Sequence, residues 1–422
     1  MLFWLGTAAF ALTILISVSL HELGHMITGK RFGMKVTRYF VGFGPTIFSF
    51  QRGETEYGLK LIPLGGFCKI VGMTPQDDDV APEDEHRAMW RFPVWKRTIV
   101  MGAGSFTHFM LALIGIWIMA IWIGLPNKDY PSTDEQVLAA PASIIVEDCT
   151  FITLPTTGTG ECKVGTDPNM VPAPAYAAGL RTGDQVTKVG ATAVTNYGQL
   201  TAAIRAQKAG AVTFDYIRNG TPASTTVTLI SAKRAPADDS TGKTADVPVA
   251  GVGLDKSKFT AIDHYNAVSA FPATGSYAWR IVEASFEAMK RIPEKIPALW
   301  HSITGAERDP NTPISVVGAS RLGGEAIEKG VPEVFWQIFI TLNVFIGIFN
   351  LLPLLPMDGG HIAIAWYEKA RSWLYARLKK PDPGRVDYYK LMPITYAVIL
   401  IGGAFTLLTV TADIVNPIQI FK

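Results

Sequence analysis

Two histidines and a glutamate close the first apolar stretch of the chain. Residues 17–30 read SVSLHELGHMITGK, so that His21 and His25 stand four apart and Glu22 follows the first histidine. On a helix this spacing puts both imidazoles on one face, where they can bind zinc while the glutamate moves a proton. Ionisable groups at the edge of an apolar run are costly to hold and usually functional. The motif predicts a hydrolytic zinc centre, although by itself it can also occur by chance on an amphipathic helix.

A catalytic zinc site needs a third protein ligand, and residues 350–361, NLLPLLPMDGGH, offer two candidates. Asp358 is the acid at the end of the third apolar stretch, and we expect it to complete the site. His361 is the alternative, although a polar residue that opens a cytoplasmic segment is its more common role. Pro353 and Pro356 break the helix here, and irregular backbone at membrane depth is tolerated where it lines a water-accessible cavity.

Four apolar stretches must position these residues. Each lacks Asp, Glu, Lys and Arg and is long enough to cross a bilayer, which takes about twenty residues. The stretches are 1–20, 98–126, 334–357 and 391–412. The first and third spans run in the same direction through the membrane. The ends that hold His21 and Asp358 therefore reach the same depth on the same side, toward the cytoplasmic boundary.

Charge gives the orientation. Segments 29–97 and 362–390 are rich in Lys and Arg, so the positive-inside rule assigns them to the cytoplasm and the long segment 127–333 to the outside. The protein is then expected in the cell membrane as a multi-pass chain, in contact with the lipid bilayer, with the candidate site toward the cytoplasmic side. A net charge of only +2 indicates no nucleic-acid partner.

The expected fold class is a polytopic α-helical membrane protein with four transmembrane helices, a membrane-associated β-hairpin and an extracytoplasmic α/β domain. The expected division is: first transmembrane helix, 1–28; cytoplasmic segment with the hairpin and an interfacial helix, 29–97; second transmembrane helix, 98–126; extracytoplasmic domain, 127–260; amphipathic helices and loop, 261–333; third transmembrane segment, 334–361; basic cytoplasmic segment, 362–390; fourth transmembrane helix and tail, 391–422.

The hairpin is predicted from residues 41–67, VGFGPTIFSFQRGETEYGLKLIPLGGF. Phe48 and Phe50 alternate with polar neighbours before a turn, and the alternation resumes after it, as in paired strands. Gly65 and Gly66 end the hairpin and would let another backbone approach closely. Such an aromatic hairpin beside a membrane is expected to dip into the interface; a small soluble hairpin is the alternative.

The outer segment alternates short strands and turns. Within it, NYGQLTAAIR (196–205) is helical in pattern, and residues 211–229 form a predicted hairpin with Asn219-Gly220 at its turn. Cys149 and Cys162 lie in this segment, where an oxidising compartment would allow a disulfide; two free thiols are an equally good reading.

Several motifs together resemble the site-2 proteases, which are intramembrane zinc metalloproteases of the M50 type. These are HELGH in the first span, NLLPLLPMDGG in the third, and a PDZ-like segment with the pattern GLRTGDQVTKVGATAV (179–194) between the second and third. The single PDZ-like insert resembles the bacterial members, especially actinobacterial ones, that cleave anti-sigma factors. The resemblance extends over nearly the whole chain.

The resemblance implies a zinc metalloendopeptidase with one Zn²⁺ per chain. It assigns His21, His25 and Asp358 as the three metal ligands. It assigns Glu22 as the general base. It also implies a polar role near the scissile bond for Asn350, which Asn343, seven residues earlier on the same helix side, could assist. The implied substrates are single-span membrane proteins that an upstream site-1 protease has already trimmed, as in regulated intramembrane proteolysis. The PDZ-like domain could bind their new chain end or exclude bulky ectodomains, and we favour the size filter.

One position departs from the family pattern. The family often carries Gly-Pro-x-x-Asn in the second span, whereas this chain reads GSFTH at 104–108. His108 could replace the asparagine, approach the metal or pair with a backbone carbonyl, and we slightly favour the carbonyl. Two rival functions, a catalytically inactive scaffold acting through its PDZ-like domain and an ion transporter, fit the complete set of ligands and base less well.

Overall fold

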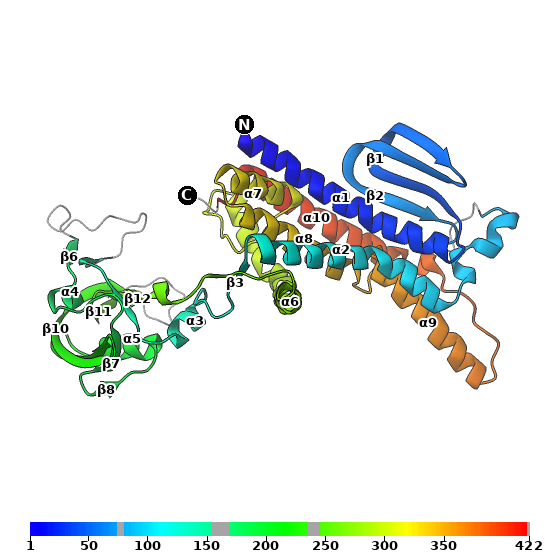
Figure 1. Cartoon of the computed structure of the whole chain (residues 1–422). Coiled ribbons are helices and arrows are strands. Elements are labelled where there is room, and N and C mark those ends of the chain that lie inside the picture. The colour runs from blue at the N-terminus through cyan, green and yellow to red at the C-terminus, as the bar shows by residue number, and fades with distance from the viewer. Residues whose placement is uncertain (74–79, 154–168, 235–244, 420–422) are drawn as a thin grey trace. The chain divides into compact units, whose positions relative to one another are not determined.

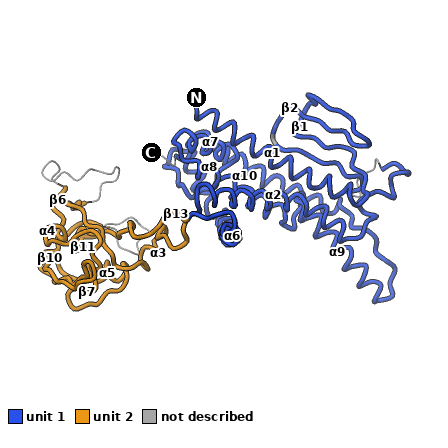
Figure 2. The backbone as a smooth tube through the Cα atoms, in the orientation of Figure 1, with its two compact units in different colours: residues 1–125, 264–422 blue, residues 126–263 orange. Residues whose placement is uncertain are grey.

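The structure is a computed structural model that describes the chain apart from residues 74–79, 154–168, 235–244 and 420–422. It divides into two compact units, each shown in its own colour in Figure 2. One unit combines Met1–Leu125 with His264–Lys422, and the other is Pro126–Asp263. Because the smaller unit is inserted into the larger one, the elements around the candidate site come from both ends of the sequence.

Four helices among the described residues are long and apolar enough to cross a membrane, which confirms the predicted number of spans. They are α1 (Leu2–Arg31), α2 (Val94–Trp122), α8 (Pro332–Asn350) and the segment that ends in α10 (Met392–Val415). All four belong to the first unit, where they lie along one another (Figure 1). The second span begins at Val94, directly after Pro93, and therefore earlier than the charge pattern indicated.

The third apolar stretch is broken where its prolines indicated. α8 ends at Asn350, residues 351–357 are irregular, and α9 (Asp358–Arg377) begins at the predicted ligand. Gly359 lies so close to the Leu351 carbonyl that a side chain there would overlap it. The irregular segment thus folds tightly over the start of α9 and places Asp358 at a helix N-terminus.

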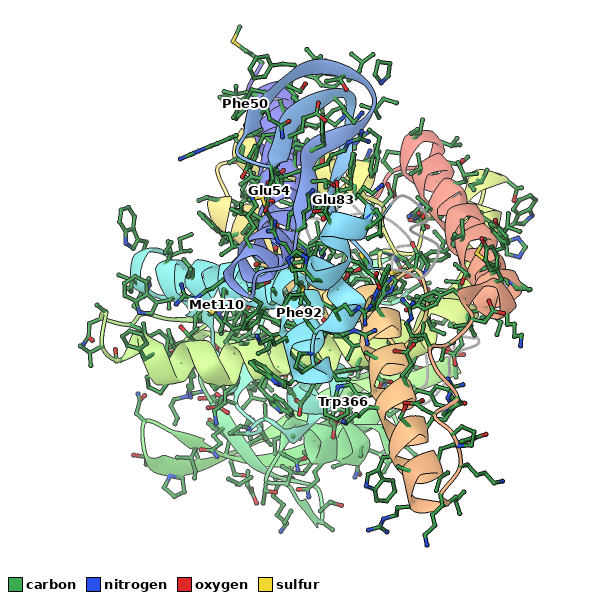
Figure 3. All side chains as sticks on the ribbon, turned by 90° about the vertical axis from the view of Figure 1, so that its right-hand side faces the viewer. Phe50, Glu54, Glu83, Phe92, Met110 and Trp366 are labelled. Atoms are coloured by element: carbon green, nitrogen blue, oxygen red, sulfur yellow. The ribbon has the colours of Figure 1, made fainter. Side chains whose placement is uncertain are left out.

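The predicted hairpin is longer and more curved than the sequence pattern indicated. β1 (Val36–Arg52) and β2 (Thr55–Ile70) pair antiparallel around a turn at Gly53, and both strands bend. Residues 36–41 therefore pair with the end of β2 and also with residues 56–59 near its start. Figure 3 shows the resulting curved sheet, with Phe50 on its outer part.

The remaining helices of the first unit brace these spans. Residues between the sheet and α2 form two short 3₁₀ turns, η1 (Pro82–Arg87) and η2 (Met89–Arg91). The segment 261–333, for which the sequence indicated amphipathic helices and a loop, contains two helices, and the first of them, α6 (Ala270–Ile303), crosses the spans (Figure 1). α7 (Val316–Glu328) packs against the first half of α1, where Gly323 meets the Phe10 ring.

The second unit is built around a five-stranded sheet in the order β11-β10-β9-β7-β8. Its helix α5 (Tyr197–Arg205) begins at Asn196, whose side chain accepts a hydrogen bond from the Gln199 backbone, as a helix cap should. Asn219 and Gly220 both have positive φ in the turn between β9 and β10, as predicted for this pair.

The elements of this unit are α3 (Asp134–Ala139), β4 (Ile144–Val146), β5 (Cys149–Phe151), β6 (Met170–Pro172), α4 (Pro174–Ala177), β7 (Gln185–Val189), β8 (Thr192–Ala193), β9 (Gly210–Arg218), β10 (Thr221–Arg234), β11 (Ala245–Val249), β12 (Val252–Leu254) and η3 (Lys256–Lys258). Short strands β3 (Leu125–Pro126) and β13 (Ile262–Asp263) pair with each other. Cys149 begins β5, but Cys162 lies outside the described residues, so the disulfide stays a prediction.

Candidate metal centre

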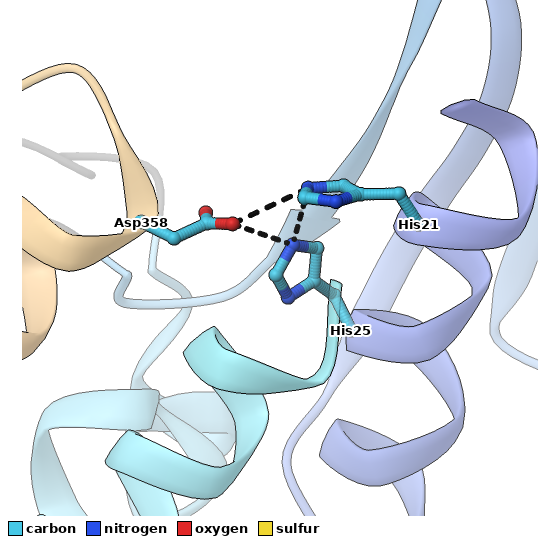
Figure 4. A group of neighbouring side chains, drawn as sticks. All are labelled: His21, His25 and Asp358. Atoms are coloured by element: carbon cyan, nitrogen blue, oxygen red, sulfur yellow. Dashed lines mark hydrogen bonds and ion pairs between the residues drawn. The ribbon is translucent and has the colours of Figure 1, made fainter. Parts of the chain in front are cut away.

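Three side chains from the two ends of the sequence meet between α1 and the start of α9 (Figure 4). The Nε2 atoms of His21 and His25 are 3.1 Å apart. Asp358 Oδ2 lies 3.3 Å from each of them. Both histidines belong to the buried stripe of α1, which recurs every three or four residues and packs against the neighbouring helices. The structure thus brings together all three residues that the sequence suggested as ligands.

The geometry of these atoms fits a metal ion. Ligands at about 2.0–2.1 Å from a tetrahedral zinc ion lie roughly 3.3 Å from one another, which matches the edges of this triangle. Asp358 Oδ2 is buried and has no hydrogen-bond partner among the described residues apart from these two Nε2 atoms. Two protonated imidazoles with their Nε2 atoms 3.1 Å apart would repel each other, whereas two lone pairs aimed at one cation would not. The donor set is therefore best explained as a zinc site.

The Nδ1 atom of His25 determines the tautomer of its imidazole ring. Its Nδ1 donates a hydrogen bond to the Val100 carbonyl of α2 at 2.7 Å. The ring proton is thereby held on Nδ1, which leaves the Nε2 lone pair free for a metal. Val100 is a functional neighbour that the sequence did not reveal, because a backbone carbonyl on another helix leaves no mark in the residue pattern.

Gly104 of α2 has no side chain, and this leaves space for the two imidazoles to approach each other. A β-carbon at this position would lie 2.6 Å from Nε2 of both His21 and His25. Any larger residue would therefore push into the place where the ligand atoms converge. The sequence contained this glycine in the GSFTH segment, but nothing in its spacing showed that it faces the histidines.

Glu22 lies on the side of α1 that faces the curved sheet. Its carboxylate accepts a hydrogen bond from the Cys68 backbone N–H of β2. Gly66 of the same strand sits against Glu22, and a β-carbon there would lie 3.5 Å from Glu22 Cγ and 2.8 Å from the Phe40 carbonyl. Gly65, next to it, has a positive φ of 115°. The predicted base is thus held between the histidines and one edge of the sheet.

The other polar residues singled out in the sequence separate into different environments. Asn350, at the end of α8, is half-buried, and its side chain makes no hydrogen bond to a described residue. His361 stays outside the ligand triangle; its ring stacks on Tyr388 with centroids 6.0 Å apart. The carbonyl partner favoured for His108 from the sequence is wrong. Its Nδ1 instead lies within hydrogen-bond distance of the Asn343 and Ser17 side chains.

Two imidazoles on a membrane-length helix, a carboxylate from the start of α9 and a glutamate beside them are the groups expected of a metal-dependent hydrolase in a membrane protein. The family model of peptidase family M50 matches residues 9–380. The chain therefore belongs to this family, the site-2 proteases, which agrees with the resemblance seen in the sequence.

Similar proteins of known name agree with this assignment. The zinc metalloprotease Rip1 of Mycolicibacterium smegmatis is 42% identical over 429 residues, and its namesake from Mycobacterium tuberculosis is 40% identical over 422 residues, with 100% of each chain covered. The regulator of sigma-E protease RseP of Escherichia coli is 26% identical and covers 86% of this chain and 91% of its own. The protein is a multi-pass membrane zinc metalloprotease, and its cofactor is zinc.

Proposed function

We propose that this protein cleaves single-span membrane proteins within or near their transmembrane segments, using a centre made of His21, His25, Asp358 and Glu22. The observation that carries the proposal is the place of Glu22, which belongs to the same helix as the two histidines and lies against the edge of β2. A proton-transferring carboxylate is thereby held where an extended substrate backbone could reach it. The name of the Escherichia coli relative, a regulator of sigma-E protease, supports anti-sigma factors as the substrates.

Each residue has a distinct part in this reaction. His21, His25 and Asp358 would hold one zinc ion, which supplies Lewis acidity for a carbonyl and for water. Glu22 takes a proton from the attacking water and returns it to the departing amine. His25 is kept in the required tautomer by the Val100 carbonyl, and Gly104 leaves the space that the ligands need.

The edge of β2 near Gly65 and Gly66 is the proposed binding surface for substrate. Residues 66–70 pair with β1 on one side, and the Cys68 N–H points to Glu22 on the other. A substrate helix must unwind before cleavage, and adding it here as a further strand would give its backbone new hydrogen-bond partners. Asn350 has an uncommitted amide and could bind the same segment.

The orientation and the role of the second unit are also proposed. The Lys- and Arg-rich segments 29–97 and 362–390 support a cytoplasmic position for both, with the site near that boundary and the PDZ-like unit outside. There the unit would act as a filter that admits substrates only after a site-1 protease has removed their ectodomains. An outer location would also permit the Cys149–Cys162 disulfide.

The test is cleavage of a tagged single-span protein by the full chain in proteoliposomes. The wild type should cut a substrate with a short ectodomain faster than the same span with a folded ectodomain. Glu22→Gln should keep its zinc and lose at least about a hundredfold in rate, since general acid–base catalysis contributes roughly 10²–10⁴-fold. Glu56→Gln on β2 is the matched control and should cleave normally. Equal cleavage rates for the wild type and Glu22→Gln would contradict the role of Glu22, and no cleavage by either protein would favour an inactive scaffold that acts through its second unit.

A further inference from the structure

Three of the membrane-length helices meet in a buried polar cluster beside the metal centre. Ser17 of α1, His108 of α2 and Asn343 of α8 are only 3%, 1% and 2% exposed. His108 Nδ1 lies 2.9 Å from Asn343 Oδ1 and 3.1 Å from Ser17 Oγ, and the Ser17 hydroxyl donates to the same Asn343 oxygen. We call these three residues the Ser-His-Asn cluster.

The direction of each hydrogen bond can be worked out from Asn343. Its Nδ2 donates to the Phe339 carbonyl of the same helix at 2.9 Å, so its Oδ1 must face the other two side chains. A carbonyl oxygen can only accept, and His108 must therefore carry a proton on Nδ1. Both polar atoms of Asn343 are thus committed inside the protein. The amide is not available to a substrate, in contrast to the assisting role that the sequence suggested for it.

The position of the cluster connects the two halves of the ligand set. Ser17 lies one helical turn before His21 on α1, and the His108 and His21 rings have centroids 5.0 Å apart. Asn343 lies on α8, which leads through the irregular segment 351–357 to Asp358. The cluster therefore ties the helix that holds the histidines to the helix that delivers the carboxylate.

We propose that the Ser-His-Asn cluster positions Asp358 against the two histidines, and that His108 is a positioning residue for the metal centre. Hydrogen bonds between membrane helices add to their van der Waals packing and help to fix the relative register of the helices. Without the cluster, α8 can shift along α1 and move the Asp358 oxygen away from the 3.3 Å distances that a zinc ion requires. The inference rests on the metal ligands named above and adds the means by which they are brought together.

The test is zinc affinity, measured by competition with a chelator on the detergent-solubilised full chain. His108→Leu removes the Nδ1 donor and should weaken zinc binding about 10–100-fold, as is typical when a residue that supports a ligand is lost. His108→Asn should restore the affinity, because its amide nitrogen is as many bonds from Cα as the Nδ1 of histidine and can donate to Asn343. Thr107→Val is the matched control: its hydroxyl binds the Ala103 carbonyl of its own helix, and zinc affinity should not change.

A double-mutant cycle separates positioning from a general loss of packing. Asp358→Ala leaves two histidines, whose weaker affinity is measured at raised zinc concentration, and in this background His108→Leu should weaken zinc binding no further. Equal losses with and without Asp358 would overturn the proposal, as would a His108→Asn variant that binds zinc as poorly as His108→Leu. Should His108→Leu not fold, Ser17→Ala replaces it in the same cycle with the same expected non-additivity. Zinc binding by the wild type that depends on Asp358 would keep the proposed centre intact even if this inference failed.

Discussion

Two clusters of ionisable groups are buried in the helical unit, and they differ in whether their charges are matched. In one, Arg308 and Asp413 face each other at 3.0 Å with side chains 3% and 1% exposed. The Asp413 carboxylate also accepts from the Ser315 backbone N–H, and Arg308 donates to Thr312 and to the Pro313 carbonyl. In the other, His21, His25 and Asp358 present three acceptor atoms to one point, with a second carboxylate, Glu22, close by.

The contrast indicates what each cluster is for. A buried carboxylate is costly unless a positive charge and hydrogen bonds compensate it. Asp413 has both within the chain: its charge is matched by Arg308, whose Nη1 alone has no hydrogen-bond partner among the described residues. The pair ties α10 to the loop before α7. Asp358 Oδ2 has only the Nε2 atoms of His21 and His25 beside it, at 3.3 Å, and we propose that a cation completes this cluster. We therefore interpret the first cluster as a structural contact and the second as the proposed metal-binding site.

The largest effect is expected from breaking the matched pair. Asp413→Ala leaves Arg308 buried without its counter-charge, which should lower the free energy of unfolding by about 3–5 kcal/mol. Denaturant unfolding in detergent, followed by tryptophan fluorescence, measures the change. The folded fraction should still bind one zinc ion per chain. Loss of zinc from correctly folded Asp413→Ala would show that the two clusters are not separate.

A second prediction concerns the space between the imidazoles. Gly104→Ala puts a methyl group against both ligand nitrogens, and a displacement of this size should lower the cleavage rate about a hundredfold, or ~2.7 kcal/mol in barrier. Gly102→Ala lies on the same helix with nothing within 4 Å of its β-carbon and serves as the control. Comparable rates for the two variants would mean that the ligands do not need the close approach of α2.

The smallest effect is expected at an exposed ion pair. Arg87 donates two hydrogen bonds to Glu54 at the sheet turn, and this contact lowers the pKa of Glu54. Its stabilisation is present above the unfolded pKa of about 4.3 and is lost as the pH falls through the lower folded value. Glu54→Gln should therefore cost at most about 1 kcal/mol at pH 7. Unfolding curves of the two proteins should converge at low pH, and a difference that persists there would contradict the assignment.

The site features that could be predicted from the sequence are those that depend on a single helix, strand or turn. The spacing of His21 and His25 is a property of one helix, and Asp358 stands out because an acid after a long apolar run is rare. The same holds for the turn at Asn219 and Gly220, whose backbone preferences are local. These features could be read without knowing which helices touch.

The part that was missed depends on contacts between elements. Gly104, the Val100 carbonyl and the link from His108 to Asn343 acquire their roles only when α2 packs against α1 and α8. Arg308 and Asp413 lie more than a hundred positions apart in the sequence, and no periodicity connects them. The bending of β1 and β2 likewise follows from how the strands pair along their whole length. Residue patterns predict helices and strands and which of their faces are buried. Which other helix or strand packs against a buried face is decided by tertiary packing.

The central claim, that the unmatched cluster is completed by zinc, is tested most directly by the metal content of the purified protein. Wild type, Asp358→Ala, the double variant His21→Ala/His25→Ala and Asp413→Ala would be compared after purification without chelators. The account predicts about one zinc per chain in the wild type and in folded Asp413→Ala, and none in the other two. A wild type without zinc, or an Asp358→Ala protein that holds it as firmly as the wild type, would contradict the account.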